Sequence, residues 1–426
     1  MSLPRAVRVI RDPIHGNINI YPTEEPILNS VEFQRLRFIA QVSLCSLVYP
    51  SAVHNRFSHS LGAMHLAGEM YRAITHNAQL PFDTNTFLAV RLAAMIHDIG
   101  HGPFSHIFER GVAFFNSQTK NKIPQPFSHE EMGLKIIDEL LHDKIHESIR
   151  ELVLKLVEGK DMPNDQWWLA QIIASEVDSD RSDFLLRDSY FAGVSYGNYE
   201  VQRLLETMTV AELPTGQAVM VFKDKGLMAI ESFLFARYNM YRGVYFHHTN
   251  LIGDAMISRA VFELIRRDLY PRVAITDPRE FVKWNDTRLY GIFHDLTYTP
   301  NVNFPDDPVF TTITGIIFRR LWKRLMVSNI PLAELRGKIG EFARDQGVNA
   351  DLISEIITVK KLPYSWVPYH FEGDKPTTIY ICDGRGKLYD LTEVSQIQVP
   401  ANFMLNKQVL VHPDFIEPLS RYLGQP

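Results

Sequence analysis

Hydrophobic residues recur every three or four positions over most of the first 270 residues, which is the period of helices that bury one face. Residues 60–76 show this spacing clearly. Residues 84–98 are apolar almost all round, as expected of a helix in the middle of a bundle. Residues 165–192 form another helical pattern, which could be broken once and which ends at Gly193. These segments predict a helical bundle.

Short β-rich stretches interrupt the helical pattern. Residues 6–21 place β-branched runs on both sides of turn-forming Asp-Pro and His-Gly pairs, which predicts a small hairpin. Residues 217–227 predict a second hairpin around an Asp-Lys-Gly turn at residues 224–226. The longest helical pattern follows directly over residues 227–269, and Pro271 stops it.

The pattern changes after residue 270. Residues 272–306 hold several prolines and aspartates between short helical pieces. The end of the chain alternates short β-rich runs, Thr377–Cys382 and Val409–His412, with glycine-containing turns. We therefore predict a mainly α fold, with a helical-bundle core at residues 1–270 and a smaller α+β C-terminal lobe at residues 271–426.

Composition and charge narrow the class of protein. The formal net charge of -5 argues against a protein that mainly coats nucleic acid, although a local basic pocket could still bind a small anion. The two cysteines, Cys45 and Cys382, are far apart, which fits a reducing compartment and excludes a cysteine-built metal site. The apolar run at residues 87–96 is short and contains Arg91, and the first residues lack the apolar centre of a signal peptide. We expect a cytoplasmic protein with no membrane segment.

Three stretches at predicted helix ends concentrate the residue types that bind metals: HNRFSH at 54–59, HDIGHGPFSH at 97–106 and DSDR at 178–181. Histidine and aspartate side by side at a helix end can both reach one ion, because the nearby glycines release the chain there. Two imidazoles and two carboxylates suit a first-row divalent ion with open positions, such as Fe, Mn, Ni or Zn. A closed structural zinc site would favour cysteine instead.

Each of these residues also has an ordinary structural interpretation. His97 alone, on an apolar helix, would more often be a core histidine with satisfied hydrogen bonds, and Asp98 could cap a helix end. The combination of His97 and Asp98 with two further histidines, after a nearly uncharged helix, favours a metal site. Buried charge there is costly unless it is paired or bound to a metal.

Together, HNRFSHS, HDIGHGPFSH and the Asp180-Arg181-x-Asp183 segment resemble the H…HD…D signature of the HD-domain phosphohydrolases. The resemblance is closest to the deoxynucleoside triphosphate (dNTP) triphosphohydrolase branch, for which RDPIHGNI and EFQRLRFIAQ near the start are also typical. It covers roughly residues 8–260, and the C-terminal lobe is similar only in general layout. The resemblance implies an enzyme that hydrolyses a dNTP to deoxynucleoside and tripolyphosphate.

The resemblance also implies roles for particular residues. It implies that one divalent ion per chain is held by His59, His97, Asp98 and Asp180, with Mg²⁺ as a candidate on the substrate phosphates. The phosphate contacts it implies are Arg56, His101, Arg181 and Arg237. The proton-transfer group is His106, and the pair that supports a water or proton relay is His129 and Glu130; histidine suits such tasks because its pKa is near working pH.

Further roles follow for the sugar and for regulation. Tyr245 would pack on the deoxyribose and exclude a 2′-hydroxyl, Gln41 and Val42 would lie near the 3′-hydroxyl, and Asp188 would face the sugar. Gln34 and Arg37 resemble residues of an activator site at which nucleotides bridge subunits. We therefore expect a homo-oligomer, with a tetramer favoured, and a nucleotide activator as a candidate partner.

The long helical pattern offers an independent observation. Arg237, Tyr241, Tyr245 and His248 are spaced i, i+4, i+8 and i+11, so they would share one face of a continuous helix. An aromatic stripe of this kind usually faces a hydrophobic core. An arginine at its head favours a wall that contacts phosphate and sugar.

The chain also departs from the pattern of the animal enzymes of this branch. Arg181 replaces a lysine, which keeps the charge but changes its reach. Phe184 replaces a tyrosine, Tyr241 a histidine and Phe246 a glutamine, so base preference is open. Asn29 replaces the aspartate that selects guanine at the activator site.

Two other classes of function stay open. One is a phosphodiesterase or nucleotidase that acts on another phosphate ester, since HD metal sites serve several reactions. The cyclic-dinucleotide branch of such enzymes carries a lysine at the position of His101, which argues against that branch for this chain. The other is a non-catalytic nucleotide sensor or single-strand binder, against which the intact ligand set and the acidic balance argue.

Overall fold

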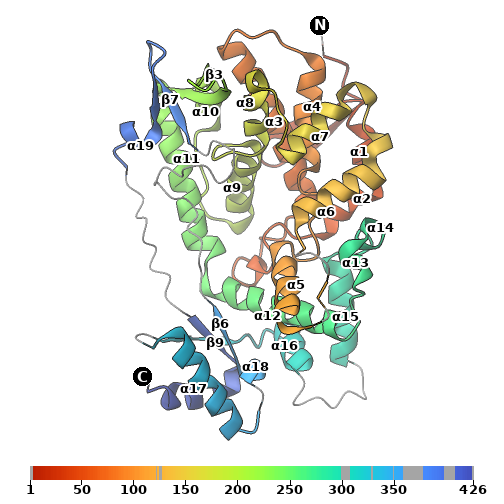
Figure 1. Cartoon of the computed structure of the whole chain (residues 1–426), viewed down its shortest axis with the longest axis vertical. Helices are drawn as coiled ribbons and strands as arrows, with labels where there is room; N and C mark the ends of the chain where they lie inside the picture. Colours follow the sequence, from red (N-terminus) through yellow and green to blue (C-terminus); the bar gives the residue numbers. More distant parts are fainter. Residues whose placement is uncertain are drawn as a thin grey trace.

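The computed structural model describes residues 3–120, 122–123, 127–298, 308–327, 330–348, 350–357, 378–397 and 408–424. The described chain is mainly helical, as predicted (Figure 1), and its described residues form three small sheets. A large helical body occupies most of the molecule, and a smaller unit with its own sheet lies at the C-terminal end. Within the described residues, no helix combines the length and apolar character needed to cross a bilayer.

The chain begins with the predicted hairpin. Strands β1 (Arg8–Asp12) and β2 (Gly16–Ile20) pair antiparallel, with Asp12 opposite Gly16. Gly16 has a φ of 74°, which glycine adopts without a steric penalty. The Asp12 carboxylate accepts the backbone N–H groups of Ile14 and His15 and so fixes the turn.

The helical body contains two short helices, α1 and α2, and seven longer helices, α3 to α9. Their bounds are α1 (Glu25–Leu28), α2 (Val31–Gln34), α3 (Arg56–Asn77), α4 (Thr84–Ile96), α5 (His106–Gln118), α6 (His129–Ile136), α7 (Glu147–Glu158), α8 (Trp167–Ile173) and α9 (Ser179–Ala192). Every residue of α4 from Phe87 to Ile96 is buried, which confirms the apolar helix predicted at 84–98. Its one charged residue, Arg91, donates to the buried carboxylate of Glu24 at 2.6 Å.

The helical pattern at residues 165–192 is broken once, as predicted. Helix α8 ends at Ile173, and α9 starts after Asp178, whose side chain accepts the backbone N–H of Arg181. Gly193 ends α9 in the left-handed conformation, with a φ of 69°. The break matters because residues 174–178 form a loop between the two helices.

The hairpin predicted around residues 224–226 is wrong. Strand β4 (Ala218–Lys223) pairs antiparallel with the strand before it, β3 (Met208–Glu212), and the turn between them closes with a hydrogen bond from Leu213 N to Gln217 O. Residues 224–226 form one 3₁₀ turn that leads into helix α11. The Asp-Lys-Gly turn therefore joins a strand to a helix instead of joining two strands. Helix α10 (Val201–Thr207) precedes β3.

The single long helix predicted at residues 227–269 is also wrong. The chain forms α11 (Leu227–Met240), a π-helical turn at Tyr241–Tyr245, and α12 (His248–Arg266). His247 interrupts the helix with extended backbone, and its side chain accepts the N–H of Thr249. His248 therefore begins a new helix and does not continue one straight stripe. Turns of π-helix are frequent at functional sites.

Four helices follow α12 and pack against the helical body: α13 (Val273–Thr276), α14 (Pro278–Phe281), α15 (Asp286–Tyr298) and α16 (Pro308–Ile317). Buried Phe281, Phe293 and Ile313 belong to the same hydrophobic core as the helices before residue 270. The division into domains at residue 270 stays a prediction, and no change of core occurs at that position. The part of the predicted 272–306 stretch from residue 299 onward lies outside the described residues.

A second hydrophobic core forms around a three-stranded antiparallel sheet in the order β5-β9-β6. The elements are β5 (Lys323–Met326), β9 (Gln408–Val411) and β6 (Ser354–Ile357), with α17 (Leu332–Asp345), α18 (Ala350–Ile353) and α20 (Ile416–Tyr422). Elsewhere, β7 (Tyr380–Cys382) lies parallel to β4 and continues that sheet with β8 (Leu388–Asp390), next to α19 (Leu391–Val394). Both predicted C-terminal β-rich runs therefore form strands, with Thr377 outside the described residues.

Candidate metal centre and active site

Three helix ends meet in the helical body and bring the predicted metal ligands together. His59 lies in the first turn of α3, which starts because Asn55 accepts the backbone N–H of Ser58. His97 and Asp98 follow directly after the end of α4. Asp180 lies in the first turn of α9. Residues more than 120 positions apart in the sequence therefore face one point.

The distances between the four side chains are short. His59 Nε2 lies 3.0 Å from Asp180 Oδ1 and 3.6 Å from Asp98 Oδ2. His97 Nε2 lies 3.2 Å from Asp98 Oδ1 and 3.6 Å from Asp180 Oδ1. Two imidazole nitrogens and two carboxylates thus converge, although they come from three separate helices.

The hydrogen bonding of the two histidines fits metal ligation. His59 Nδ1 lies 2.8 Å from Asp183 Oδ2, and His97 Nδ1 lies 2.7 Å from the carbonyl oxygen of Ala94. The Nε2 atoms of both rings are buried, and neither makes a hydrogen bond within the described chain. A histidine that donates one ring N–H to an oxygen and leaves the other nitrogen free is the usual arrangement at metal sites. The donor set of two nitrogens and two carboxylates fits a first-row divalent ion.

A buried network behind His59 holds its ring in place. Arg187 donates to both oxygens of Asp183 at 2.8 Å and to Asp12 at 2.8 Å, and His15 Nε2 lies 2.6 Å from Asp183 Oδ1. Sequence reasoning gave no role to Asp12, His15 or Arg187. The four-residue spacing of Asp183 and Arg187 was the available signal, because such pairs share a helix face.

The charges at the site favour a cation. Burial alone would lower the pKa of His59, but Asp180 and Asp183 raise it to about 10. Burial would raise the pKa of Asp98, but Arg56, His97 and His101 hold it well below its usual range. The carboxylates therefore stay ionised, and their negative charge is available for a bound cation.

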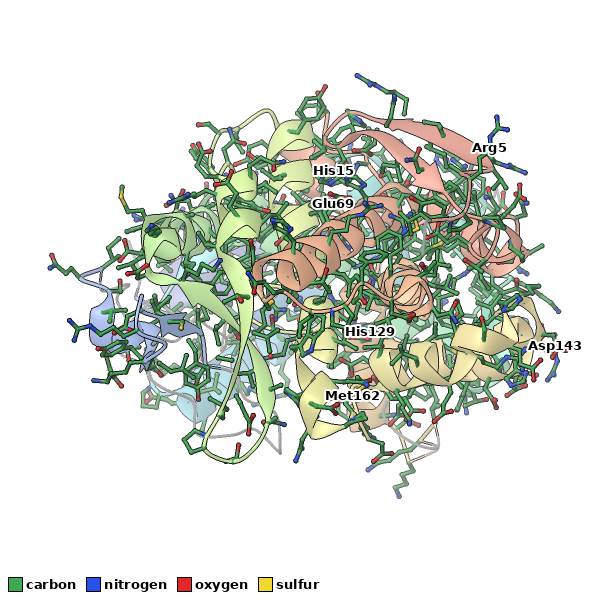
Figure 2. The ribbon with its side chains drawn as sticks, turned by 90° about the horizontal axis from the view of Figure 1, so that it is seen from above. Arg5, His15, Glu69, His129, Asp143 and Met162 are labelled. Carbon is green, nitrogen blue, oxygen red and sulfur yellow. The ribbon has the colours of Figure 1, made fainter. Side chains whose placement is uncertain are left out.

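Next to the ligands lies a cluster of three histidines, His101, His106 and His129. The rings of His101 and His129 stack at a centroid distance of 4.1 Å, and the ring of His106 meets both edge-on at 4.8 and 5.0 Å. His101 Nε2 lies 3.2 Å from Asp98 Oδ1, which joins the cluster to the ligands. In the view from above, His129 lies well inside the outline of the molecule (Figure 2).

Glu109 organises this cluster, and the sequence-based interpretation missed it. Its Oε1 lies 2.5 Å from Nδ1 of His129 and accepts the backbone N–H of the same residue at 2.9 Å, while its Oε2 lies 3.3 Å from Nδ1 of His106. The predicted partner of His129, Glu130, is exposed and instead accepts the hydroxyl of Ser128 at 3.3 Å. The spacing of three residues between His106 and Glu109 on one helix could have indicated the pairing.

The three arginines predicted to bind phosphate are all held by acceptors within the chain. Arg56 donates to Ser105 Oγ at 2.7 Å and forms an ion pair with Asp98. Arg181 pairs with Asp178, and Arg237 Nη1 lies 2.6 Å from Glu176 Oε2. The acceptors of Arg181 and Arg237 both lie in the loop between α8 and α9 or at its end.

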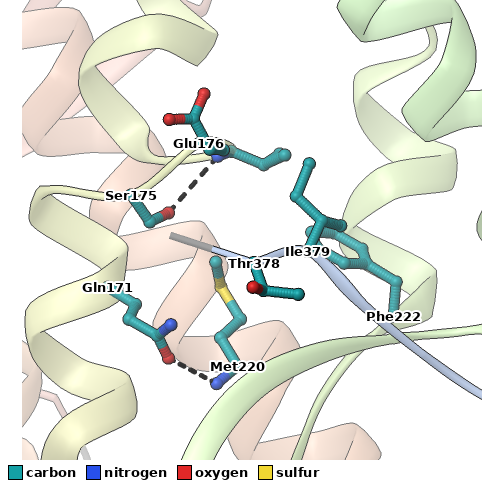
Figure 3. A pocket seen from close by; sticks show the side chains of 8 residues that line it. Gln171, Ser175, Glu176, Met220, Phe222, Thr378 and Ile379 are labelled. Carbon is teal, nitrogen blue, oxygen red and sulfur yellow. Dashed lines mark hydrogen bonds between the residues drawn. The ribbon is translucent and has the colours of Figure 1, made fainter. Parts of the chain in front are cut away.

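That loop also borders a small cavity, seen from close by in Figure 3. Gln171 and Ser175 line one side, and Met220, Phe222 and Ile379 line the other. A volume of about 10 Å³ leaves room for at most one water molecule. A nucleotide therefore does not fit there.

The predicted sugar-facing residues lie together beside the histidine of the first motif. Tyr245 donates its hydroxyl to Asp188 Oδ2 at 2.6 Å, and His54 Nε2 lies 2.7 Å from Asp188 Oδ1. The ring of Tyr241 meets that of Tyr245 edge-on at 4.9 Å. The buried Oε1 atom of Gln41 makes no hydrogen bond within the described residues, so it is available to a ligand.

The predicted activator residues form a pair of their own. Arg37 Nε donates to Gln34 Oε1 at 2.7 Å, and the Arg37 guanidinium lies 3.6 Å from the ring centre of Phe57. Arg37 is exposed to solvent. Its role and that of Gln34 stay predictions.

A helical body in which two histidines and two aspartates from three helix ends converge is the architecture of an HD-type metal site. The sequence model named HD domain matches residues 56–188, and the model named HD associated region matches residues 200–358. The chain therefore belongs to the HD-domain phosphohydrolases.

Particular relatives agree with this family. An uncharacterized protein of Methanocaldococcus jannaschii is 40% identical over 262 residues, which are 61% of this chain and 50% of the relative. A protein of Dictyostelium discoideum named deoxynucleoside triphosphate triphosphohydrolase SAMHD1 homolog is 31% identical over 301 residues, covering 68% of this chain and 56% of the relative. The chain thus spans about half the length of these curated relatives.

Solved structures match over nearly the whole chain. A phosphohydrolase from Bacteroides thetaiotaomicron has a TM-score of 0.76 and 26% sequence identity, and the match covers 95% of this chain and 99% of that one. A hypothetical protein from Aquifex aeolicus has a TM-score of 0.73 and 26% identity over 98% and 99%. The C-terminal unit is therefore shared with these structures.

Proposed function

We propose that the protein hydrolyses deoxynucleoside triphosphates to deoxynucleoside and tripolyphosphate, with one divalent ion held by His59, His97, Asp98 and Asp180. The observation that carries the proposal is the pair of buried Nε2 atoms of the two histidines, which make no hydrogen bond within the described residues and lie beside two ionised carboxylates. A bound divalent ion supplies a Lewis acid for phosphate oxygens. The name of the Dictyostelium relative supports the choice of substrate.

The arginines around the site suit a triphosphate. Arg56 lies beside Asp98, and Arg181 and Arg237 lie at the loop next to Asp180. Each carries a fixed positive charge, which stabilises the negative charge that develops on phosphate oxygens during hydrolysis. Among the neutral groups, Tyr241 is expected to line the same wall.

The histidine cluster suits proton transfer. His106 projects with 64% of its side chain exposed, so it can reach a bound substrate, whereas His101 is buried. We assign proton transfer to His106 and a phosphate contact to His101. His129 would support the relay of water or protons. Glu109 suits the role of carboxylate partner in this relay better than Glu130 does, because Glu109 contacts both His106 and His129.

The part of the proposed active site around Tyr245 suits a deoxyribose. The Tyr245 hydroxyl donates its only proton to Asp188, so it has no proton to donate to a 2′-hydroxyl. Gln41 offers a free carbonyl oxygen for the 3′-hydroxyl. We therefore propose a preference for deoxyribose over ribose.

The test is incubation of the purified protein with all four dNTPs and either Mn²⁺ or Mg²⁺, followed by chromatography of the products. We expect deoxynucleoside and tripolyphosphate. Monophosphate and pyrophosphate, or no turnover, would favour the alternatives of another phosphate-ester hydrolase or a nucleotide sensor. The same samples measured by light scattering, with and without nucleotide, test the expected tetramer and the activator role of Gln34 and Arg37; a monomer under both conditions would contradict them.

A further inference from the structure

The short segment that joins the metal ligands to His106 has an unfavourable backbone. Phe104 and Ser105 have φ angles of 56° and 58°, although neither is glycine. Residues with side chains adopt this left-handed region at a cost, and they persist there only when surrounding contacts hold them. Because His106 follows directly as the first residue of α5, the same contacts decide where its imidazole points.

The contacts that hold the segment come from α15, more than 180 residues further along the chain. Asp286 Oδ1 accepts the backbone N–H of Phe104 at 2.7 Å, and its Oδ2 accepts the N–H of Ala40 at 2.9 Å. Asp286 is 7% exposed. One buried carboxylate therefore joins the strained segment to the chain that precedes the first metal-ligand motif.

The side chain of Phe104 packs against the same face of α15. Tyr290 and Phe293 follow Asp286 by four and seven residues, so the three share one helix face. The Phe104 ring meets Tyr290 edge-on at 5.2 Å and lies parallel to Phe293 at 6.4 Å. Backbone and ring of Phe104 are thus both fixed by one helix.

From this point a chain of hydrogen bonds reaches the metal ligands. Ser105 Oγ donates to the carbonyl oxygen of Ala40 at 3.2 Å and accepts from Arg56 Nε at 2.7 Å. Arg56 in turn pairs with Asp98. The position of Ala40, which Asp286 also holds, therefore affects the guanidinium beside the ligands.

A second buried contact runs in parallel. Arg35 donates to the carbonyl oxygen of Ile99 at 2.7 Å and to that of Trp284 at 3.2 Å. Ile99 directly follows Asp98, and Trp284 precedes α15 by two residues. The segment from Trp284 to Phe293 is therefore attached to the HDIGHGPFSH stretch at both of its ends.

We propose that Asp286 is a positioning residue for the reaction: it holds the Phe104–Ser105 turn so that His106 and Arg56 face the substrate. Asp286 lies in the HD associated region, whereas the metal ligands and His106 that it would help to position lie in the HD domain. The inference rests on the proposed function, because it concerns the same site. Asp286 would affect turnover without contacting the metal or the substrate.

The ionisation of Asp286 agrees with this role. Burial raises its pKa to about 6, and the N–H groups of Ala40 and Phe104 limit the rise. The carboxylate is thus ionised at neutral pH, when both of its oxygens can accept. Replacing it by asparagine leaves one oxygen and turns an N–H donor towards one of the two backbone N–H groups.

The experiment compares the wild type with Asp286→Asn and Asp286→Ala in the full-length protein. Metal content, kcat and KM for dATP, and hydrogen exchange of the backbone amides of Phe104, Ser105 and His106 are measured on the same samples. We expect metal content near that of the wild type, kcat per bound metal lower by roughly 10- to 100-fold, KM within about threefold, and faster exchange at Phe104. A displacement of about 1 Å in a reacting group produces losses of this size.

A matched control separates positioning from general destabilisation. Glu24 is fully buried and accepts the backbone N–H of Tyr21 and the side chain of Arg91, so Glu24→Gln also disturbs a buried carboxylate, but away from the site. We expect it to lower the melting temperature and to leave kcat per bound metal unchanged. If Asp286→Ala does not fold, Asp286→Asn gives the comparison, since it preserves the side-chain shape.

Two results would overturn the inference: unchanged exchange at Phe104 in the folded Asp286 variants, or a loss of kcat no larger than in Glu24→Gln. Failure of the proposed function has a different signature. In that case the wild type itself does not hydrolyse any dNTP, and the exchange of the amides of Phe104, Ser105 and His106 still decides whether Asp286 holds the turn.

Discussion

The Nη1 atom of Arg237 lies 2.6 Å from the Oε2 atom of Glu176, so a guanidinium proposed to bind phosphate is already paired with a carboxylate. A triphosphate that binds the Nη1 atom of Arg237 competes with Glu176 for it. The Glu176 side chain is 23% exposed, which allows it to move into solvent when it leaves.

We predict that Glu176→Gln lowers the KM for dNTP by roughly 3- to 10-fold with little change in kcat, because the competing negative charge is lost. Steady-state kinetics measures both constants. Glu139→Gln, which disrupts the surface pair with Arg279, is the control and should change neither. A higher KM in Glu176→Gln would show instead that Glu176 holds Arg237 in its binding position.

We predict about one divalent ion per chain in the purified protein and loss of that ion, with at least 100-fold lower turnover, in Asp180→Ala. Removing Asp180 takes away one of the four proposed ligands and leaves Asp98 as the only carboxylate among them, which weakens the attraction for a divalent cation. Elemental analysis measures the ion. Asp143→Ala, at a fully exposed position on the edge of the molecule (Figure 2), should retain it. Stoichiometric metal in a variant lacking both Asp98 and Asp180 would refute the ligand set.

We predict that the wild type turns over dATP roughly tenfold to a hundredfold better than ATP, because a buried 2′-hydroxyl without a partner costs on the order of 1–3 kcal/mol. Tyr245→Ala should reduce this preference, since it removes the ring. Tyr245→Phe keeps the ring and loses only the hydrogen bond to Asp188, so it should keep most of the preference. Equal turnover of both nucleotides by the wild type would defeat the idea.

We predict that His65 makes the fold less stable in acid. Burial, followed by the charges of His15 and Arg91, lowers its pKa to about 4 in the folded chain, against a usual value of 6.5. The unfolded chain therefore binds a proton that the folded chain does not between these values, and stability falls as pH drops from 6.5 to 4. The contribution is at most about 3 kcal/mol. Urea unfolding of His65→Gln at pH 7 and pH 4.5 should show a smaller loss than the wild type; an equal loss would exclude His65 as the source.

The sequence by itself determined the class of fold and, through its family resemblance, pointed to the four residues that we propose as metal ligands. The apolar helix at 84–98 follows from periodicity, which is a local property, whereas the position of the break before Asp178 was not predicted. The motif HDIGHGPFSH concentrates its chemistry within ten residues, so no tertiary contact was needed to recognise it.

Only the tertiary structure decided where the long helix is interrupted and which residues hold the site in place. The π-helical turn at Tyr241–Tyr245 is set by packing, because Tyr245 bonds to Asp188 on another helix, and periodicity alone predicted one continuous helix. Glu109 in place of Glu130 as the partner of His129 depends on how α5 faces α6. Asp286 could not be assigned from sequence at all, because its two partners, Ala40 and Phe104, are brought to it by packing and contribute only backbone N–H groups, which every residue except proline has.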